Sequence, residues 1–391
     1  MNEKAPFALF RDDPAGRSLV FDGPKDIVMA RTAAEVLPAL RRLEEARLAG
    51  QWLAGYISYE AGYVFEDKLR PLIVDDRPTP LIAMGIFDKP SGNDHPLAGR
   101  PGTVVDDGSS QGSFLSEPRT GWDFATYQER FDRLHQHLRN GDCYQANLTM
   151  PVAARWHGDP LSAFWSLVAR QPVRYGAFVD LGGPVILSRS PELFFSVDAE
   201  RFIETHPMKG TAPRGATVAE DEAIIAEMLA DEKTLAENRM IVDLLRNDIS
   251  MISEVGSLSV PKLFEIETYP TVHQMVSHVR AKLLPEIGFP DILAALFPCG
   301  SITGAPKMWA MRILADLERE PRDVYCGAIG WCDPAGPMRF SVAIRTITLF
   351  NGEKAVFNVG GGIVFDSKAE AEYDECLLKA RFAVGDQWIS R

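Results

Sequence analysis

The sequence has few cysteines, and they show no pairing pattern. Its 391 residues include five, an odd number without a C-x-x-C pair: Cys143, Cys299, Cys326, Cys332 and Cys376. This argues against a disulfide framework and against a zinc site. We therefore expect reduced cysteines that serve as small buried hydrophobic side chains.

Long apolar runs and basic residues in excess are also missing. No stretch approaches the roughly 18 apolar residues of a membrane span, and Met1 to Lys4 lead into no secretory segment. We expect a cytoplasmic protein without membrane contact. The net charge of -13 disfavours a nucleic-acid binder. An anionic substrate would therefore need local cations or a metal ion.

What is present is an ordinary globular composition, with 46% hydrophobic and 24% charged residues. Residues 88–118 are rich in proline, glycine and serine, which predicts a linker between an N-terminal region (1–118) and a second region (119–391). One strand, Val104-Val105, is possible within it.

Periodicity predicts an α+β chain with antiparallel sheets, because short strands follow one another with brief turns. The expected helices cover residues 31–49, 124–138, 219–250, 291–297, 306–319 and 369–384. The expected strands cover residues 52–60, 81–87, 144–154, 175–179, 185–188, 193–197, 257–260, 276–284, 325–332, 339–350 and 355–359.

Three details of this pattern bear on function. Tyr144, Ala146, Leu148, Met150 and Val152 alternate and should share one strand face. Arg345 is expected in mid-strand, where an arginine usually has an anionic partner. The triple glycine 360–362 is expected to interrupt the last strand.

The loop Glu204 to Gly215 contains a lysine between prolines and glycines. Pro207 restricts the backbone, and Gly210 allows close approach to a ligand. Such a loop can hold Lys209 in place and offer N–H groups to an anion. Taken alone, the loop is better explained as a solvated turn that carries a lysine, because short motifs of this kind occur often by chance.

Four further segments accompany this loop. They are Ser190-Pro191-Glu192-Leu193, the helical stretch from Glu237 to Asp248, the loop Gly300 to Lys307, and the region from Arg345 through the triple glycine to Glu372, Glu375 and Lys379. The Gly300 loop opens a helix, whose N-terminus favours anions, but its spacing is not that of a Walker loop.

Together these motifs resemble the chorismate-utilising enzymes, most strongly over residues 120–385. The resemblance implies an α+β fold of two packed antiparallel sheets flanked by helices, with the active site in the cleft between the sheets. The N-terminal region would belong to the same body. The stretch Gly55 to Glu60 is similar to the aminodeoxychorismate branch of the family.

The resemblance also implies residue roles. Lys209 would be the catalytic nucleophile and Glu192 the general acid, while Glu237, Glu375 and Glu372 would serve a Mg²⁺ site. Tyr325 and Arg345 would hold the enolpyruvyl carboxylate. Further substrate contacts are expected from Gly210, Thr211, Thr303, Gly360, Gly361, Gly362, Lys379 and Gln145.

Two positions indicate the branch. Lys209 stands where anthranilate synthases typically have alanine. Gln145 stands where hydroxylating relatives have a water-activating lysine, and glutamine cannot act as a base. The resemblance therefore implies amination of chorismate at carbon 4, with ammonia from a separate glutamine amidotransferase subunit. The alternatives are an anthranilate synthase component, a non-catalytic scaffold for an amidotransferase, and a pyridoxal-phosphate lysine enzyme.

Two positions depart from the family pattern. Gln274 precedes Met275-Val276-Ser277 where relatives often have histidine, so a direct role for the neighbouring His273 is doubtful. Thr234 stands where relatives often have an acid, one turn before Glu237, which would tune metal affinity.

Overall fold

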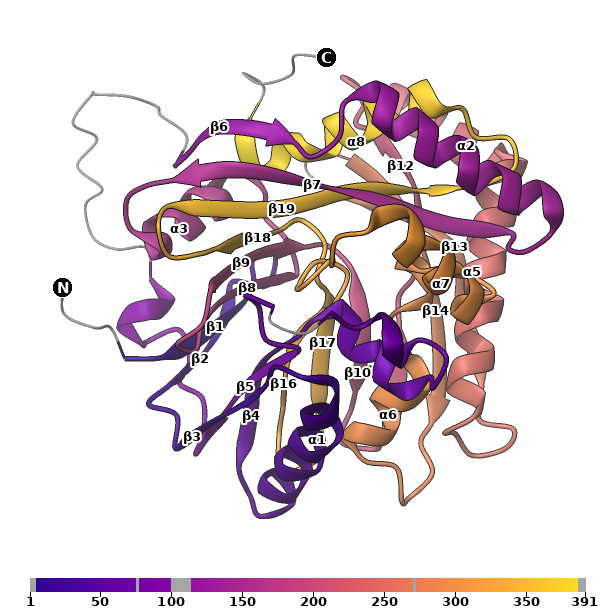
Figure 1. Ribbon diagram of the computed structural model, residues 1–391. Helices are drawn as coiled ribbons and strands as arrows, with labels where there is room; N and C mark the ends of the chain where they lie inside the picture. Colours follow the sequence, from indigo (N-terminus) through magenta and orange to yellow (C-terminus); the bar gives the residue numbers. More distant parts are fainter. Residues whose placement is uncertain (1–4, 75–76, 100–113, 270–271, 386–391) are drawn as a thin grey trace.

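The computed structural model describes residues 5–74, 77–99, 114–269 and 272–385. In this part of the chain, two antiparallel sheets carry helices on their outer faces (Figure 1). The possible strand at Val104-Val105 lies outside the described residues.

The bounds of the strands are β1 Phe7–Asp12, β2 Arg17–Asp22, β3 Asp26–Ala30, β4 Trp52–Ile57, β5 Ile82–Phe87, β6 Leu115–Thr120, β7 Gln145–Trp156, β8 Tyr175–Asp180, β9 Val185–Ser190, β10 Leu193–Val197, β11 Phe202–Thr205, β12 Met208–Pro213, β13 Ser259–Thr268, β14 Val272–Lys282, β15 Gly304–Ala305, β16 Ala328–Cys332, β17 Met338–Val342, β18 Thr346–Leu349 and β19 Lys354–Ile363. The α-helices are α1 Ala33–Leu48, α2 Phe124–Asn140, α3 Pro160–Arg170, α4 Val218–Ala230, α5 Glu232–Ser250, α6 Phe289–Leu296, α7 Lys307–Glu318 and α8 Ala369–Val384. None of the helices in the described part has the length and apolar character needed to cross a lipid bilayer.

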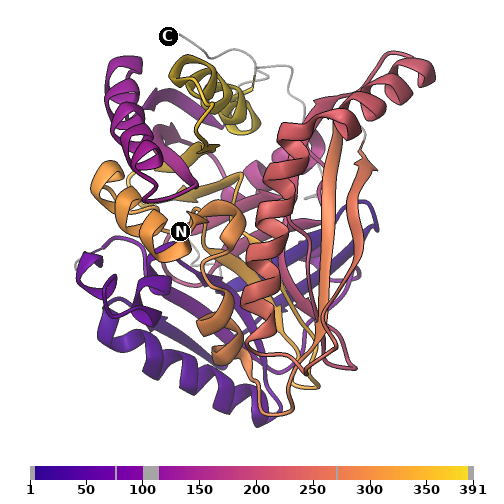
Figure 2. The same ribbon diagram turned by 90° about the vertical axis from the view of Figure 1, so that its right-hand side faces the viewer.

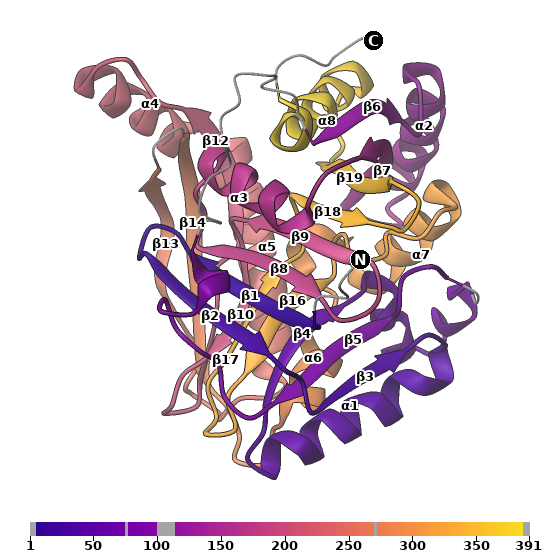
Figure 3. The ribbon, with the colours of Figure 1, turned by 90° about the vertical axis from the view of Figure 1, so that its left-hand side faces the viewer.

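Strands from the N-terminal region take part in both sheets. The first sheet has the order β15-β7-β19-β18-β9-β8-β1-β2, with β6 also paired to β7. The second has the order β12-β14-β11-β10-β17-β16-β4-β5-β3, with β13 also paired to β14. Figure 3 shows β1 and β2 continuing the sheet beyond β8. The two regions thus share their sheets, while the boundary at residue 118 stays a prediction.

Strand β7 is buried on both faces from Gln145 to Met150, and its two faces carry different kinds of side chain. The alternating residues Ala146, Leu148, Met150 and Val152 are fully buried in a hydrophobic cluster with helices α2 and α8. Side chains alternate along a strand, so the other face presents Gln145, Asn147 and Thr149, which are also buried. Tyr144 was expected on the apolar face, but it precedes the strand and is exposed.

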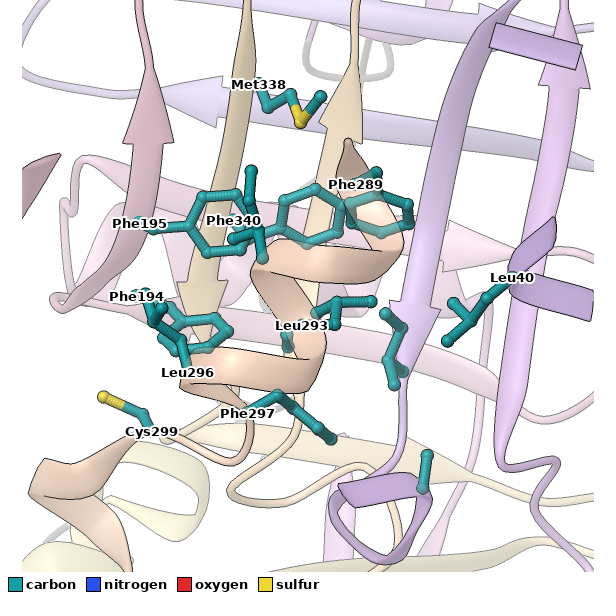
Figure 4. Packing of buried hydrophobic residues seen from close by; sticks show 14 of the residues in the cluster. Leu40, Phe194, Phe195, Phe289, Leu293, Leu296, Phe297, Cys299, Met338 and Phe340 are labelled. Atoms are coloured by element: carbon teal, nitrogen blue, oxygen red, sulfur yellow. The ribbon is translucent and has the colours of Figure 1, made fainter. Parts of the chain in front are cut away.

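The second sheet is stabilised by helices α1, α5 and α6 on its outer face. Phe340 on β17 stacks between Phe195 and Phe289, with ring centroids 5.2 and 5.1 Å away (Figure 4). Full burial of such a side chain contributes roughly 1.5–3 kcal/mol. The five cysteines are free and buried, as expected.

Several expected elements differ in the structure. The helix predicted over 219–250 is two helices, because Asp231 ends α4 and its side chain caps α5 by accepting from Lys233 N. Figure 2 shows α4 extending away from the body beyond α5. Strand β19 runs through the triple glycine without interruption. The predicted linker contains β6, and strands β1–β3 were not predicted.

A buried arginine joins the N-terminal region to the rest of the molecule. Arg322 is 2% exposed, and its guanidinium donates two hydrogen bonds to Glu318, at 2.8 and 2.7 Å. It also donates to the carbonyls of Ile302 and Asn147. Glu60, which accepts from Arg77, accepts from the backbone N–H of Arg322 at 2.6 Å.

We expect Arg322→Met to lower the free energy of unfolding by about 3–5 kcal/mol, because Glu318 would remain buried without its partner. Urea unfolding followed by circular dichroism measures the change. The matched control is Arg133→Met, since Arg133 forms an exposed ion pair with Asp316 and such pairs contribute about 0–1 kcal/mol. Equal losses in the two variants would contradict the role of Arg322.

Candidate active site

Lys209 lies on β12, an edge strand of the second sheet that pairs with β14. Burial of its amine lowers the pKa, against the opposing charges of Glu237, Glu192 and Glu375, while Lys379 lowers it further. In the described part of the chain, the amine has no hydrogen-bond or ion-pair partner. The side chain is partly buried, and a lowered pKa favours the neutral amine, the form that acts as a nucleophile.

The backbone after Lys209 is held in a position that requires glycine. Gly210 has a φ of 81°, and a β-carbon there would lie 2.5 Å from the Thr234 methyl group. Gln274 donates to the Gly210 carbonyl and accepts from the Thr211 hydroxyl, both at 2.7 Å. Gln274 thus positions this strand. The sequence analysis noted it only as a departure from the family pattern.

The triple glycine forms a surface without side chains beside Lys209. A β-carbon on Gly362 would lie 2.2 Å from Gln145 Nε2 and 3.4 Å from Lys209 Nζ. A β-carbon on Gly361 would lie 3.0 Å from Glu372 Oε2 and 3.9 Å from Lys379 Nζ. Strand β19 therefore brings together predicted site residues from β7, β12 and α8.

Gln145 points from the polar face of β7 into this site. It is 1% exposed, and its Oε1 has no hydrogen-bond partner among the described residues. Buried polar atoms normally have partners. The free amide oxygen is therefore available to a hydrogen-bond donor on a ligand.

Glu192 occupies the turn between β9 and β10, as the sequence predicted. It is 5% exposed, and burial raises its pKa to about 7, against a hydrogen bond from Ser301 and the charge of Lys209. Ser301 Oγ donates to Glu192 Oε1 at 2.6 Å. At neutral pH this carboxyl group can hold and release a proton, which suits a general acid.

The hydroxyl that contacts Glu192 was not singled out from the sequence. The loop Gly300 to Lys307 contains both Ser301 and Thr303, and spacing alone could not choose between them. The Thr303 hydroxyl donates to the carbonyls of Cys299 and Gly300 within its own loop. Its contact with a substrate stays a prediction.

Helix α8 contributes acidic residues and Lys379 above the triple glycine. Burial raises the pKa of Glu372, whose Oε1 accepts from Ser367 Oγ at 2.7 Å. Glu375 pairs with Lys379 at 2.7 Å, and Lys379 also donates to the Gly360 carbonyl at 2.8 Å. The predicted face of this helix is therefore directed at the site.

The three glutamates predicted to bind the metal lie near the site, but their carboxylates are not all close to one another. Glu237 on α5 and Glu375 on α8 both raise the pKa of Lys209. In the described chain, Glu237, Glu372 and Glu375 do not have ligand atoms all within 4.8 Å of one another. Mg²⁺ commonly uses only one or two carboxylates, with water and substrate oxygens as its other ligands. Glu237 and Glu375 fit that requirement.

Arg345 is not in mid-strand, as was predicted, but at the break between β17 and β18. Its φ is 50°, and its carbonyl accepts from Arg189 N. Burial lowers the pKa of its guanidinium, and no described carboxylate pairs with it. The side chain is partly buried, and a partly desolvated cation without an anionic partner is suited to an anionic ligand. Tyr325, also predicted here, is 7% exposed.

Two cavities lie away from Lys209. One, of about 430 Å³, lies between the sheets near Arg11, Arg174 and Trp331. The other, of about 420 Å³, is lined by Tyr325, Thr346 and Asn358 among others. Neither is lined by Lys209 or Glu192. Of the predicted site residues, only Tyr325 lines either cavity.

Two other motif residues have structural partners. Lys307 donates to Asp248 at 2.6 Å and to the Leu296 carbonyl. The His273 ring bonds Thr268 and Asp221, and Asp221 also binds Arg214. His273 therefore holds the segment after β12 in place.

With this geometry established, comparison with known proteins is direct. A family described as chorismate binding enzyme matches residues 5–385. The chain belongs to this family. The aminodeoxychorismate synthase component 1 of Escherichia coli K12 is 44% identical over 254 residues, 65% of this chain and 55% of that protein. The anthranilate synthase component 1 of Methanothermobacter marburgensis is 40% identical over 255 residues, with the same shares covered.

The matched region thus spans about half the length of these curated relatives. Among solved structures, anthranilate synthase component I from Streptococcus pneumoniae superimposes with a TM-score of 0.76 at 28% identity, covering 97% of this chain and 90% of that chain. A putative isochorismate synthase from Bacillus anthracis gives a TM-score of 0.76 at 18% identity, covering 98% and 96%. The predicted fold class is confirmed.

The raised pKa of Glu192 predicts a pH-dependent contribution to stability. The folded protein holds this proton up to about pH 7, whereas the group's ordinary pKa is 4.5. Stability from this group is full below pH 4.5 and is lost as pH rises through 7. Relative to wild type, Glu192→Gln should therefore gain about 3 kcal/mol between pH 4.5 and 8.

Urea unfolding at a series of pH values measures this difference. Glu129→Gln, at an exposed position on α2, should follow the wild-type profile. Parallel profiles for wild type and Glu192→Gln would show that the buried carboxyl does not hold its proton.

Proposed function

We propose that the chain is the chorismate-aminating component of an aminodeoxychorismate synthase. It would convert chorismate and ammonia to 4-amino-4-deoxychorismate, the precursor of 4-aminobenzoate in folate biosynthesis. The observation that carries this proposal is the Lys209 amine, which is partly buried beside the triple-glycine strand, has a lowered pKa and has no described partner. Similarity alone does not choose the branch, since aminodeoxychorismate and anthranilate synthases match at 44% and 40% identity.

The first step would use Lys209 and Glu192 together. The neutral lysine amine attacks ring carbon 2, both conjugated ring double bonds shift by one position toward carbon 4, and the bond from carbon 4 to its hydroxyl breaks. Glu192 gives its proton to that hydroxyl, which leaves as water. The lowered pKa of Lys209 and the pKa of Glu192 near 7 both support these roles.

In the second step, ammonia attacks carbon 4 and both ring double bonds shift back. The bond between carbon 2 and the lysine nitrogen breaks, and Lys209 leaves as a neutral amine. Glu192 recovers its proton from the new ammonium group. This order places the new nitrogen on carbon 4 and returns both residues to their starting states.

The remaining residues would bind the substrate. Arg345 and Tyr325 would hold the enolpyruvyl carboxylate, because Arg345 lacks an anionic partner in the described chain. Glu237 and Glu375 would hold Mg²⁺, which would neutralise the ring carboxylate, with Glu372 and Lys379 beside it. Other contacts would come from Gly210, Thr211, Thr303 and the 360–362 backbone.

Gln145 would keep water from being activated. An amide cannot take a proton from water, and Gln145 stands next to Lys209 over Gly362. Hydroxylation is therefore disfavoured against amination. We propose that ammonia comes from a separate glutamine amidotransferase subunit, because the aminodeoxychorismate synthase relatives include proteins named as component 1.

We expect Lys209→Ala to lose most of its aminodeoxychorismate product, because the variant lacks the amine that would attack ring carbon 2. With chorismate and Mg²⁺ but no ammonia, wild type should form a covalent adduct on the peptide that contains Lys209. Mass spectrometry detects the adduct, and chromatography identifies the product made with ammonium. Lys89→Ala, at an exposed loop position, is the matched control.

Three outcomes would count against parts of this proposal. If Lys209→Ala makes aminodeoxychorismate at the full rate, Lys209 is not the nucleophile. If the wild-type protein makes anthranilate, the chain is an anthranilate synthase component and not an aminodeoxychorismate synthase component. No Mg²⁺-dependent loss of chorismate in a folded protein would favour the scaffold alternative.

Replacing either metal-binding glutamate should weaken Mg²⁺ binding. We expect Glu237→Gln and Glu375→Gln each to raise the Mg²⁺ concentration for half-maximal activity by at least about tenfold. Activity titrations with Mg²⁺ measure this, with Glu129→Gln as control. Unchanged titrations in both variants would remove these residues from the metal site.

A further inference from the structure

A second group of possible metal ligands lies on the second sheet. Glu204 on β11 and His206 after it are two residues apart, and His278 lies on the neighbouring strand β14. The two imidazole rings stack with centroids 3.8 Å apart and planes 25° apart. Glu204 Oε2 is 3.6 Å from His206 Nε2, and Oε1 is 3.8 Å from His278 Nδ1.

This group is incompletely satisfied within the described chain. The Nε2 atoms of His206 and His278 are shielded from solvent and have no hydrogen-bond partner there. The distances from Glu204 to both rings exceed those of a hydrogen bond. Buried polar atoms without hydrogen-bond partners are uncommon in proteins, and a bound water molecule or ion often supplies the partner.

The spacing suits a metal ion. The three ligand atoms all lie within 4.8 Å of one another. Ligands about 2.0–2.1 Å from a tetrahedral zinc ion lie roughly 3.3–3.4 Å apart. The separations of 3.6 Å to His206 and 3.8 Å to His278 involve the two different oxygens of Glu204, so binding one ion requires the carboxylate and the rings to turn toward it. Two imidazoles and one carboxylate are a known zinc donor set, with a fourth position left for water.

Glu265 on β13 lies beside the second ring nitrogen of His278. Its Oε2 lies 3.9 Å from His278 Nε2 and 2.7 Å from Lys262 Nζ. Metal-bound histidines usually donate their other N–H to a carboxylate, which selects the tautomer. A proton on His278 Nε2 would face Glu265 and leave Nδ1 free for the metal.

The local charges favour a cation. Each nearby basic residue already has a carboxylate partner, Arg280 with Asp198 and Lys262 with Glu265, whereas Glu204 has ion-pair contacts only with the two histidines. A single divalent ion can serve both nitrogens and the carboxylate.

The group is separate from the proposed Mg²⁺ site. Ser277 on β14 donates to Asn238 on α5, so Ser277 faces that helix. Adjacent strand residues point to opposite faces, and His278 therefore faces away from α5 and from Glu237. A metal ion bound by both His206 and His278 would join β14 to the segment that follows β11. His206 lies three residues before Lys209 in that segment.

We propose that Glu204, His206 and His278 form a Zn²⁺-binding site on the second sheet. The absence of cysteine pairs argued against a zinc site in the sequence, but these ligands are histidines and a carboxylate brought together by strand pairing. Zn²⁺ is favoured over Mg²⁺ because imidazole ligands suit zinc and Mg²⁺ prefers oxygen ligands.

Calorimetric titration of the metal-free full chain with Zn²⁺, in excess Mg²⁺, tests the proposal. Wild type should bind one Zn²⁺ tightly at this site. His278→Gln, His206→Gln and Glu204→Gln should each weaken binding at least tenfold, and Glu265→Gln should weaken it less. His157→Gln, at an exposed position, is the matched control. Circular dichroism confirms that each variant is folded.

Co²⁺ provides an independent probe, because its visible absorption reports imidazole coordination in a tetrahedral site. The double variant Glu237→Gln/Glu375→Gln should keep both the Zn²⁺ binding and the Co²⁺ spectrum. Two results would overturn the proposal: undiminished Zn²⁺ binding in Glu204→Gln and His278→Gln, or loss of Zn²⁺ only in the double variant. Should His278→Gln not fold, Glu204→Gln and His206→Gln carry the same comparison.

Discussion

The active-site geometry depends on the buried ion pair between Arg322 and Glu318. The guanidinium of Arg322 bonds the carbonyls of Ile302 and Asn147. Ile302 follows Ser301, which contacts Glu192, and Asn147 lies two residues from Gln145. One buried side chain thus bonds two neighbouring segments of the site, the loop that leads into β15 and strand β7, which also pair with each other. Such a pair gives little net stability, but loss of either partner leaves a buried charge.

Burial also sets the reactivity of the two central groups. Desolvation disfavours a charged group, so it raises the pKa of Glu192 and lowers that of Lys209. In water at neutral pH, a glutamate and a lysine would both be charged. In this site, the same physical effect favours a protonated acid beside a free amine. These are the states that acid-assisted amine attack needs.

The sequence predicted local structure well where one pattern dominates a segment. The alternation along β7 correctly predicted that Gln145 and Leu148 lie on opposite faces of this strand. The fold class and most of the predicted helices were also confirmed. The triple glycine was wrongly expected to break a strand, because glycine is weak in strands unless close packing requires it. Gly360 and Gly362 do lie against β7. Arg345 was misplaced because its left-handed backbone is set by tertiary packing. Likewise, the choice of Ser301 over Thr303 depends on how the loop folds.

Strand β14 connects features that are distant in the sequence. Gln274 holds the strand that carries Lys209, and Ser277 contacts Asn238, the residue after Glu237. His278, on the opposite face, belongs to the proposed zinc site. A shift of β14 would therefore displace Lys209, the helix that carries Glu237 and the histidine pair. Because β14 is paired on both sides, by β13 and by β11 and β12, such a shift is resisted by the sheet itself. Rigid strands of this kind allow a reactive amine to be held without a hydrogen-bond partner of its own.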